Sequence, residues 1–539
     1  MLARAKRQNW LVRMFFGLLL LAGLLLFRDY GVSVDEPTDH HNGAINAKYV
    51  AEQLFPALLP ADADLRRIPP LASNKNNDHG VLFELPVAGL GRLLADGQPG
   101  HYFLLRHLCV FLTFVGGTWA LYRLAWLQFG HRLAGLLAAA LLVFSPRFFA
   151  EAFFNGKDIV FMAFFTLAMY TLARLLQRPT LWWALVHGLA TAAAIGLRLP
   201  AFIIVAFTVA GVGLLAAFPG PNDTIPTRRL ARMLAVYGCA TVLGTIACWP
   251  YLWEAPLAHF LEAYQSLSRY GWPFSTLYLG QFVPAAQLPW HYVPVWMLIT
   301  TPLPYVLAAV LGVGASVRQI LRQRFSMART LPGRLHLLTL GWLLGPVLMV
   351  IVLRSTLYDG WRHLYFVYPA LLLLAVRGLL LLGRAAAQPR QWVRHLATAL
   401  LLLLGGETLR TVARIVQLHP YQHLYFSFLP ARVAEQQFER DYWGLAFRQG
   451  LDWVLAHDPA PQVTVASDVP DMVYANAFLL SASDQARLRR VPAAQSAPPA
   501  RYFLANYRWH PQPYPDSLGT EVYTIRAGGI KILSVFRRP

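Results

Sequence analysis

Apolar runs of membrane-spanning length recur from the N-terminus of the chain to about residue 411. The first lies between Met14 and Phe27, and further stretches of spanning length, or nearly so, centre on Val115, Leu141, Leu167, Ala190, Ala206, Leu243, Val306, Leu344, Leu373 and Leu402. About 20 mostly apolar residues cross a bilayer as a helix. Hydrophobic residues make up 56% of the chain and charged residues 14%, which is more apolar than a soluble core requires. The sequence therefore predicts an α-helical polytopic membrane protein with about 11 transmembrane helices.

The first run resembles a signal peptide, because four basic residues precede it within the first 13 positions. The run is succeeded by Arg28-Asp-Tyr30, however, rather than by the small residues of a cleavage site. We therefore expect an uncleaved first span with a cytoplasmic N-terminus.

The formal net charge of +20 could indicate nucleic-acid binding, but the arginines lie in short clusters between the apolar runs. When the spans alternate from a cytoplasmic N-terminus, the clusters near residues 123–132, 174–178, 228–232, 318–334 and 384–394 all fall on the inner side, as the positive-inside rule requires. We expect no nucleic-acid partner, a multi-pass protein of the lipid bilayer, and an extracytoplasmic C-terminus.

Two domains are expected. Residues 1–411 would form the transmembrane domain, with outer loops at 28–100 and 251–292; short interfacial helices fit the first loop, and Leu257 to Leu267 have helical spacing in the second. After that the composition changes, and residues 412–539 read as a small extracytoplasmic α/β domain with a helix face at Trp443 to Val454 and strands near 463–466, 502–504, 522–525 and 530–535. Cys109, Cys239 and Cys248 show neither disulfide nor metal-ligand spacing.

Two adjacent carboxylates, Asp35 and Glu36, come soon after the first span and begin the long outer loop. A sugar carried on a polyprenyl phosphate already has a competent leaving group, so an enzyme that transfers it needs a carboxylate to deprotonate or orient the acceptor and cations to neutralise the departing phosphate. Asp35 is the leading candidate for the base, with Glu36 beside it. Helix capping or solvent exposure at the end of a span is the alternative explanation of this pair.

Candidate cations occur at other outer corners. Lys157 and Asp158 lie in Asn155-Gly-Lys-Asp158 at the start of the fourth span, and Asp158 could orient the lysine, cap the helix or bind a metal. Arg198, Arg362 and His363 are outward-facing exceptions to the inner clusters, which indicates an anionic partner, although each could instead snorkel or pair with an aspartate. We expect these groups and Asp35 to face one common cavity.

The sequence identifies no definite cofactor and leaves a divalent metal possible. Asp78 and His79 are candidates for substrate binding, and they could also contribute metal ligands, as could His40 and His41. No spacing among these residues is diagnostic of a metal site.

Several motifs together resemble a known class. These are Val34-Asp-Glu-Pro37, Phe154-Asn-Gly-Lys-Asp158, Tyr358-Asp-Gly-Trp-Arg-His-Leu-Tyr-Phe-Val-Tyr-Pro369, His419-Pro-Tyr-Gln-His-Leu-Tyr-Phe426 and Asp441-Tyr-Trp-Gly444. In this order they resemble the GT-C class of glycosyltransferases, and most closely bacterial relatives of dolichyl-phosphate-mannose protein mannosyltransferases and of aminoarabinose transferases. The resemblance covers the chain to about Leu455.

The resemblance implies a GT-C-like fold in a bacterial inner membrane and an inverting transfer of a hexose or pentose from a polyprenyl-phosphate-linked donor to an extracytoplasmic protein, lipid or glycan. Asp35 would be the base or acceptor-orienting group, with Glu36 beside it, and Arg362 would face the lipid phosphate. Asp78-His-Gly-Val-Leu-Phe-Glu-Leu-Pro86 stands where aminoarabinose transferases have a Lys-Pro-Pro pattern, so neither sugar nor acceptor can be inferred from the resemblance.

Two other functions remain open. A transporter or flippase for a lipid-linked anion would also need many spans and outer cations, but it predicts ionisable residues near midplane, where these spans hold mostly Leu, Ala, Val and Phe. A structural factor whose outer domain binds a partner does not explain the acidic corner after the first span.

Overall fold

The computed structural model describes residues 2–58, 67–221, 225–268, 271–491 and 500–538. Every predicted apolar stretch is helical. We call the following helices the helical bundle: α1 (Leu2–Leu26), α5 (Pro99–Phe129), α6 (Arg132–Val143), α7 (Pro146–Phe154), α8 (Asp158–Gln177), α9 (Leu181–Ile195), α10 (Ile203–Ala217), α11 (Thr227–Cys248), α13 (Tyr292–Thr300), α14 (Leu303–Gln323), α15 (Leu331–Val352), α16 (Tyr368–Ala386) and α17 (Gln391–Gln417).

Within the described residues, nine helices are long and apolar enough to cross a membrane, or ten if α6 and α7 form one broken span. These two helices meet at an angle of 72°. The bend is placed by Pro146, which lacks an N–H and disfavours helical backbone at Ser145. The remaining predicted span, centred on Ala190, is α9, which is apolar but has only 15 residues. The sequence predicts about eleven spans, and the described residues contain nine or ten helices that qualify, together with the shorter α9.

The helix α8 lies at the centre of the bundle. Within its most apolar window 83% of the residues are buried, compared with 11% for α1 and for α17. Packing around α8 is dense on both sides, with α5 and α9 as its main neighbours. Because α8 begins at Asp158, its N-terminus carries that residue into the interior of the protein.

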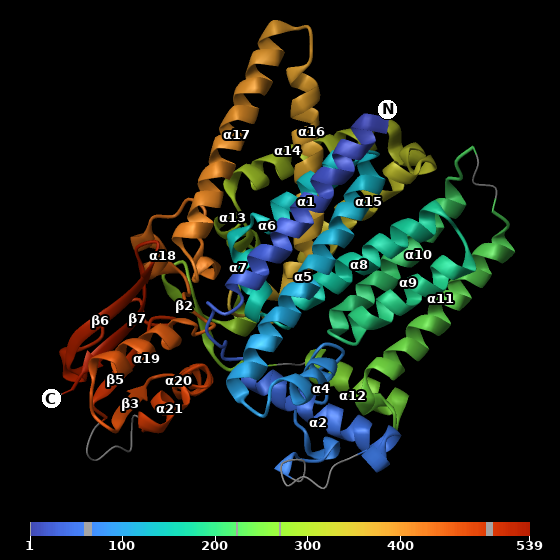
Figure 1. The fold of residues 1–539 in the computed structure, drawn as a ribbon. Helices are drawn as coiled ribbons and strands as arrows, with labels where there is room; N and C mark the ends of the chain where they lie inside the picture. Colours follow the sequence, from blue (N-terminus) through green and yellow to red (C-terminus); the bar gives the residue numbers. More distant parts are fainter. Residues whose placement is uncertain (1, 59–66, 222–224, 269–270, 492–499, 539) are drawn as a thin grey trace.

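The two outer loops are partly helical. The first contains α2 (Glu36–Leu54), η1 (Pro56–Leu58), η2 (Leu71–Ser73) and α4 (Glu84–Leu94), and the second contains η4 (Pro250–Leu252), α12 (Pro256–Ser268) and a hairpin of β1 (Ser275–Tyr278) and β2 (Gln281–Pro284). In Figure 1, α2, α4 and α12 lie at the end of the bundle opposite to the N-terminus and to the α16–α17 connection. The first loop therefore contains short helices, as the sequence predicts.

The C-terminal part is an α/β domain. It contains α18 (Ala431–Gln437), α19 (Ala446–His457), β3 (Val463–Ser467), α20 (Pro470–Ala477), α21 (Ala482–Arg487), β4 (Leu488–Arg490), β5 (Tyr502–Asn506), β6 (Thr520–Ala527) and β7 (Ile530–Arg537). The sheet order is β4-β3-β5-β7-β6, and β3 is parallel to both neighbours while β7 is antiparallel to both of its own. All four predicted strands are present, and the three-residue β4 is additional.

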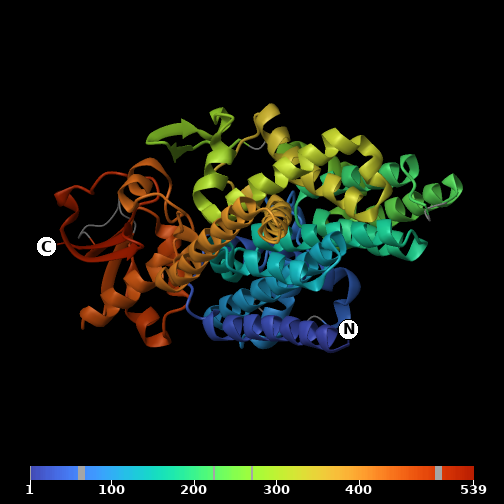
Figure 2. The same ribbon diagram turned by 90° about the horizontal axis from the view of Figure 1, so that it is seen from above.

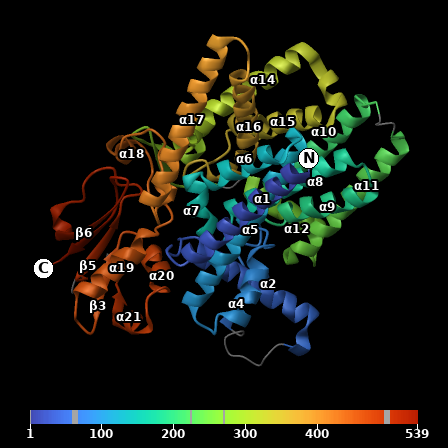
Figure 3. The same cartoon turned by 45° about the horizontal axis from the view of Figure 1, so that its top comes forward.

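The domain lies beside the helices. Viewed from above, it occupies the edge of the molecule opposite to α10 and α11 (Figure 2). The long helix α17 leads into it and forms a projecting hairpin with α16 (Figure 3). The domain boundary predicted after residue 411 falls within α17.

Candidate active site

The segment before Asp35 is fixed by the C-terminal domain. The backbone N–H of Val34 donates to the carbonyl of Trp443 at 3.0 Å. The side chain of Asn476 accepts from the N–H of Val32 at 3.1 Å and donates to the carbonyls of Val32 and Gly444 at 3.1 and 3.0 Å. Because these bonds are buried, they hold the start of the first outer loop against the C-terminal domain.

Asp35 occupies the N-cap position of α2, but its side chain makes no capping hydrogen bond. Its Oδ1 instead accepts from the hydroxyl of Tyr442 at 2.6 Å, and its Oδ2 lies 3.7 Å from Nη1 of Arg362. The side chain keeps 24% of its surface exposed. A carboxylate that is held by neighbours yet reachable from solvent can accept a proton from a bound hydroxyl.

Glu36 points away from Asp35, into the protein. Its side chain is fully buried, and its Oε2 accepts from the N–H of Ser33 at 2.6 Å. Its Oε1 lies 3.2 Å from Nε2 of His107 and 3.4 Å from Nε of Arg106. Glu36 lines neither of the two cavities described below, so these contacts suit a positioning role at the start of α2.

Arg106 is a buried hub that sequence reasoning missed. It is fully buried in α5 and forms ion pairs with Glu36, Asp39 and Glu84. Burial, together with the nearby Asp39 carboxylate, raises the pKa of Glu84 to about 7. The sequence held one signal for this cluster. Arg106 is a cation within an apolar run, and such a residue needs acidic partners.

The corner between α7 and α8 presents Lys157. The N–H of Asp158 donates to Oδ1 of Asn155 at 2.8 Å, which caps α8. Gly156 lies so close to the Arg106 guanidinium that a Cβ there would collide with it. The Nζ of Lys157 pairs with Oδ1 of Asp39 at 2.7 Å. Burial alone would lower the pKa of Lys157, but the carboxylates of Asp39 and Asp35 together raise it above its usual value.

Asp158 joins the two predicted arginines. Its Oδ1 pairs with Nη1 of Arg198, and its Oδ2 lies 3.3 Å from Nη1 of Arg362. Arg362 therefore bridges Asp158 and Asp35, and its Nη2 also donates to the Tyr442 hydroxyl at 3.2 Å. Asp158 thus pairs with two arginines. In the part of the chain that the structure describes, its ion pairs do not include Lys157.

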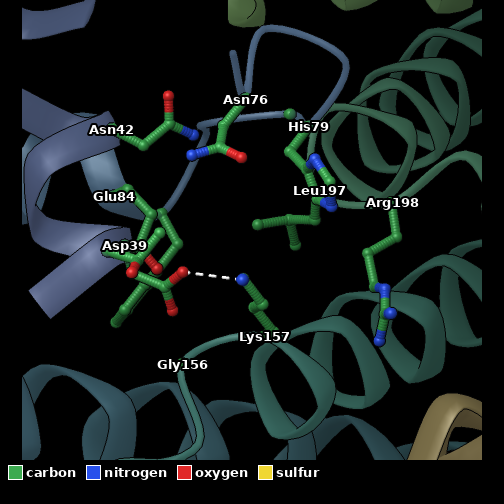
Figure 4. Close-up of a pocket in the computed structure, with 12 residues that line it drawn as sticks. Asp39, Asn42, Asn76, His79, Glu84, Gly156, Lys157, Leu197 and Arg198 are labelled. Carbon is green, nitrogen blue, oxygen red and sulfur yellow. Dashed lines mark ion pairs between the residues drawn. The ribbon is translucent and has the colours of Figure 1, made fainter. Parts of the chain in front are cut away.

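A first cavity contains Lys157 and Arg198. It encloses about 560 Å³ of space that is partly open to solvent. Figure 4 shows Lys157 in its centre, reaching towards Asp39, with Glu84 on the same side and Arg198 on the opposite side. The lining comprises Thr38, Asp39, Asn42, Asn76, His79, Gly80, Phe83, Glu84, Gly156, Lys157, Leu197 and Arg198. Lysine and arginine nitrogens at one cavity can bind a phosphate group.

A second cavity contains Arg362 and Tyr442, which both contact Asp35. Its roughly 390 Å³ of empty space includes space that is open to solvent. Its lining comprises Arg147, Glu151, Trp296, Asp359, Arg362, Tyr365, His423, Glu439, Arg440, Tyr442 and Trp443. These residues come from the helical bundle, from the segment that leads into the C-terminal domain, and from the stretch between α18 and α19 of that domain.

The expectation of one common cavity is only partly met. Asp35, Asp158, Arg198 and Arg362 form one network of ion pairs, but Lys157 and Arg198 line the first cavity, whereas Arg362 lines the second. Asp35 lines neither cavity. Asp35 contacts two residues of the second cavity, Tyr442 and Arg362, and its charge raises the pKa of Lys157 in the first cavity.

The remaining candidates are more peripheral. His79 lines the first cavity, and its Nδ1 lies 2.7 Å from Oδ1 of Asp78. Oδ2 of Asp78 accepts a hydrogen bond from the hydroxyl of Ser266 at 2.6 Å. His363 lines neither cavity, and its ring packs edge-on against Tyr358. The ring of His40 packs against Tyr102. Within the described residues, no three His, Cys, Asp or Glu side chains converge on a point that could hold a metal ion.

Comparisons with known proteins agree with the resemblance drawn from the motifs. The family model of dolichyl-phosphate-mannose-protein mannosyltransferase matches residues 102–250, from α5 to the start of η4. No curated protein sequence matches the chain. Among solved structures, the chain is similar to apo ArnT from Cupriavidus metallidurans, with 15% sequence identity, a TM-score of 0.50, and coverage of 98% of each chain. The chain thus has a GT-C-like polytopic membrane fold and resembles the membrane glycosyltransferases of the protein mannosyltransferase and ArnT type.

Proposed function

We propose that this protein is a membrane glycosyltransferase that moves a sugar from a polyprenyl-phosphate carrier to an extracytoplasmic acceptor with inversion at the anomeric carbon. The observation that carries the proposal is the position of Asp35, a solvent-accessible carboxylate linked through Arg362 and Asp158 to the cationic first cavity. A base and a phosphate site at the same end of the bundle are what this transfer requires. The family match and the fold support the same chemistry.

The leaving phosphate would bind in the first cavity. Lys157 and Arg198 keep 34% and 22% of their side-chain surfaces exposed, so both can offer N–H groups to a ligand while they remain paired with Asp39 and Asp158. The first cavity lies between the outer loops and the start of α8, at the end of the bundle assigned to the outer side by the arginine clusters. A polyprenyl tail in the bilayer would place its headgroup near this end.

The reaction would be a single displacement. An acceptor hydroxyl gives its proton to the carboxylate of Asp35, and its oxygen forms a bond to the anomeric carbon as the bond from that carbon to the phosphate oxygen breaks. The electron pair of the broken bond leaves with the polyprenyl phosphate, whose added charge Lys157 and Arg198 stabilise. Attack from the face opposite to the phosphate inverts the configuration of the sugar.

The test is a transfer assay with the full chain in lipid nanodiscs. Labelled polyprenyl-phosphate mannose, glucose, galactose and pentose are each mixed with an acceptor extract from bacterial envelopes. We expect protein-dependent release of polyprenyl phosphate and label in an acceptor glycoside of inverted configuration. If no donor is consumed, while the protein in sealed vesicles moves the labelled lipid between leaflets, the protein is a flippase and the proposal fails.

A further inference from the structure

The lining of the second cavity contains buried polar atoms without a hydrogen-bond partner among the described residues. They include Nε1 of Trp296, Nδ1 of His423 and Nε of Arg440, on side chains that are only 2%, 3% and 5% exposed. Oε2 of Glu439 also has no well-aligned partner, although the Thr276 hydroxyl interacts with this carboxyl group. Most buried polar side-chain atoms in proteins have a hydrogen-bond partner. Unsatisfied atoms of this kind on one cavity lining therefore indicate a polar ligand with both donors and acceptors.

The same side chains are fixed by their other atoms. Nε2 of His423 lies 3.0 Å from Oδ1 of the buried Asp441, and Oε1 of Glu439 accepts from Nε1 of Trp509 at 2.7 Å. Burial raises the pKa of Glu439 to about 7, so near neutrality this carboxyl can either donate or accept a hydrogen bond. The wall is thus preorganised, and its unsatisfied atoms have defined positions.

The rest of the lining suits an uncharged sugar ring. It holds three arginines and three acidic residues, which can donate hydrogen bonds to and accept them from sugar hydroxyls: Arg147, Arg362, Arg440, Glu151, Asp359 and Glu439. Aromatic side chains supply flat apolar surface, and the largest are Trp296, Tyr365, Tyr442 and Trp443. Aromatic surface with a few placed donors and acceptors is the usual construction of a site for a small polar molecule.

The geometry of an inverting displacement indicates whether the donor or the acceptor binds in the second cavity. The nucleophile approaches the anomeric carbon from the side opposite to the phosphate, and the base must lie on the side of the nucleophile. Asp35 contacts Tyr442 and Arg362, which line the second cavity, whereas Lys157 and Arg198 line the first. The second cavity therefore lies on the acceptor side of the base.

We propose that the second cavity binds a neutral sugar unit of a carbohydrate acceptor and presents one of its hydroxyls to Asp35. This inference rests on the proposed function for the role of Asp35, but binding of a sugar in the cavity can be measured without any transfer. It assigns the acceptor class as glycan, rather than as a protein side chain or a lipid phosphate.

The test is saturation-transfer difference NMR of the full chain in nanodiscs, since maltoside detergents carry sugar headgroups that would compete. The probes are methyl α-mannoside, methyl β-glucoside, methyl β-galactoside and methyl β-N-acetylglucosaminide. We expect at least one to bind in the roughly millimolar range and to bind about three- to tenfold more weakly to Trp296→Phe, which removes the indole N–H together with part of the ring, and to Glu439→Gln, which keeps the shape of the side chain. Trp290→Phe, an exposed tryptophan near the same helix, is the matched control and should bind as the wild type does.

A second set of binding measurements distinguishes the ligands of the two cavities. Lys157→Gln should weaken binding of polyprenyl phosphate and leave glycoside binding unchanged, and saturating polyprenyl phosphate should not displace the glycoside. Equal glycoside binding to wild type and Trp296→Phe, or displacement of the glycoside by polyprenyl phosphate, overturns the proposal. Glycoside binding with the expected pattern in a protein that transfers no sugar would overturn the proposed function while upholding the second cavity as a sugar site.

Discussion

The hydroxyl of Tyr442 donates a 2.6 Å hydrogen bond to Asp35, from which 407 positions separate it in the chain. Tyr442 belongs to the C-terminal domain, between α18 and α19, and Asp35 to the first outer loop. Arg362, which contacts both residues, is the first residue of the 3-10 helix η7 (Arg362–Val367) before α16. Three distant parts of the sequence therefore meet at the proposed base, and the C-terminal domain helps to position it.

Tyr442→Phe should lower the rate of sugar transfer about five- to tenfold, because Asp35 loses a hydrogen bond that orients its carboxylate. The protein should still fold, since the ring and its contact with Trp443 are retained. The transfer rate at saturating donor measures the effect. Tyr474→Phe, at an exposed tyrosine of the same domain, serves as the control, and an equal rate in the two variants would remove Tyr442 from the site.

Lys157→Gln should weaken binding of a polyprenyl-phosphate donor by about tenfold or more, because a charge-assisted hydrogen bond to the phosphate is lost. Lys157→Arg should retain part of the affinity. Binding is measured by titration of polyprenyl phosphate into protein in nanodiscs, at low and at high salt. Lys75→Gln changes an exposed lysine of the first outer loop and should bind normally. Unchanged affinity in Lys157→Gln would place the phosphate elsewhere.

Arg362→Ala should destabilise the protein. Arg362 is buried and pairs with Asp158 and Asp359, whose side chains are 0% and 2% exposed, and removal of one partner from buried ion pairs costs about 3–5 kcal/mol. We expect a lower melting temperature than for Arg362→Lys. Arg410→Ala removes an exposed arginine with a surface ion pair and should change stability little. Equal melting temperatures for Arg362→Ala and Arg410→Ala would contradict the ion-pair network.

Glu439 should make stability depend on pH. Burial raises the pKa of this carboxyl from its ordinary 4.5 to about 7, so the folded state favours the neutral form. The stability that Glu439 contributes is complete below pH 4.5 and is lost as the pH rises through 7. The melting temperature of the wild type should therefore fall more between pH 6 and 8 than that of Glu439→Gln, which is neutral throughout. Parallel pH profiles for the two proteins would show that Glu439 is already ionised at pH 6.

The helices and the strands of the C-terminal domain could be predicted, because their signals are local. An apolar run of sufficient length, such as that around Leu167, predicts a membrane-spanning helix without information from the rest of the fold. In the structure this run is the buried helix α8. Residues 530–535 contain three β-branched apolar residues, Ile530, Ile532 and Val535, and this composition likewise predicts β7. The three-residue strand β4 was missed because its pairing with β3 depends on the fold.

The site was predicted in part. Asp35, Asp158, Arg198 and Arg362 form one network of ion pairs, and the charges of Asp35 and Arg362 act on Lys157, which is paired with Asp39. Their division between two cavities depends on packing, which no local pattern encodes.

Other residues of the site escaped sequence reasoning. Asp39 and Glu84 form ion pairs with the buried Arg106 of α5, and the meeting of these three helices depends on the tertiary fold. Nothing in the sequence linked Tyr442 to Asp35, because contacts between residues so far apart arise only from the tertiary fold.

The central claim is that Asp35 is the base of a sugar transfer. The most direct measurement compares wild type, Asp35→Asn and Asp35→Glu in the nanodisc transfer assay, with polyprenyl-phosphate binding as the check on folding. We predict that Asp35→Asn binds the lipid phosphate normally and transfers at least about 100-fold more slowly, because asparagine cannot accept the proton, whereas Asp35→Glu retains part of the rate. Transfer by Asp35→Asn at the wild-type rate would contradict the account.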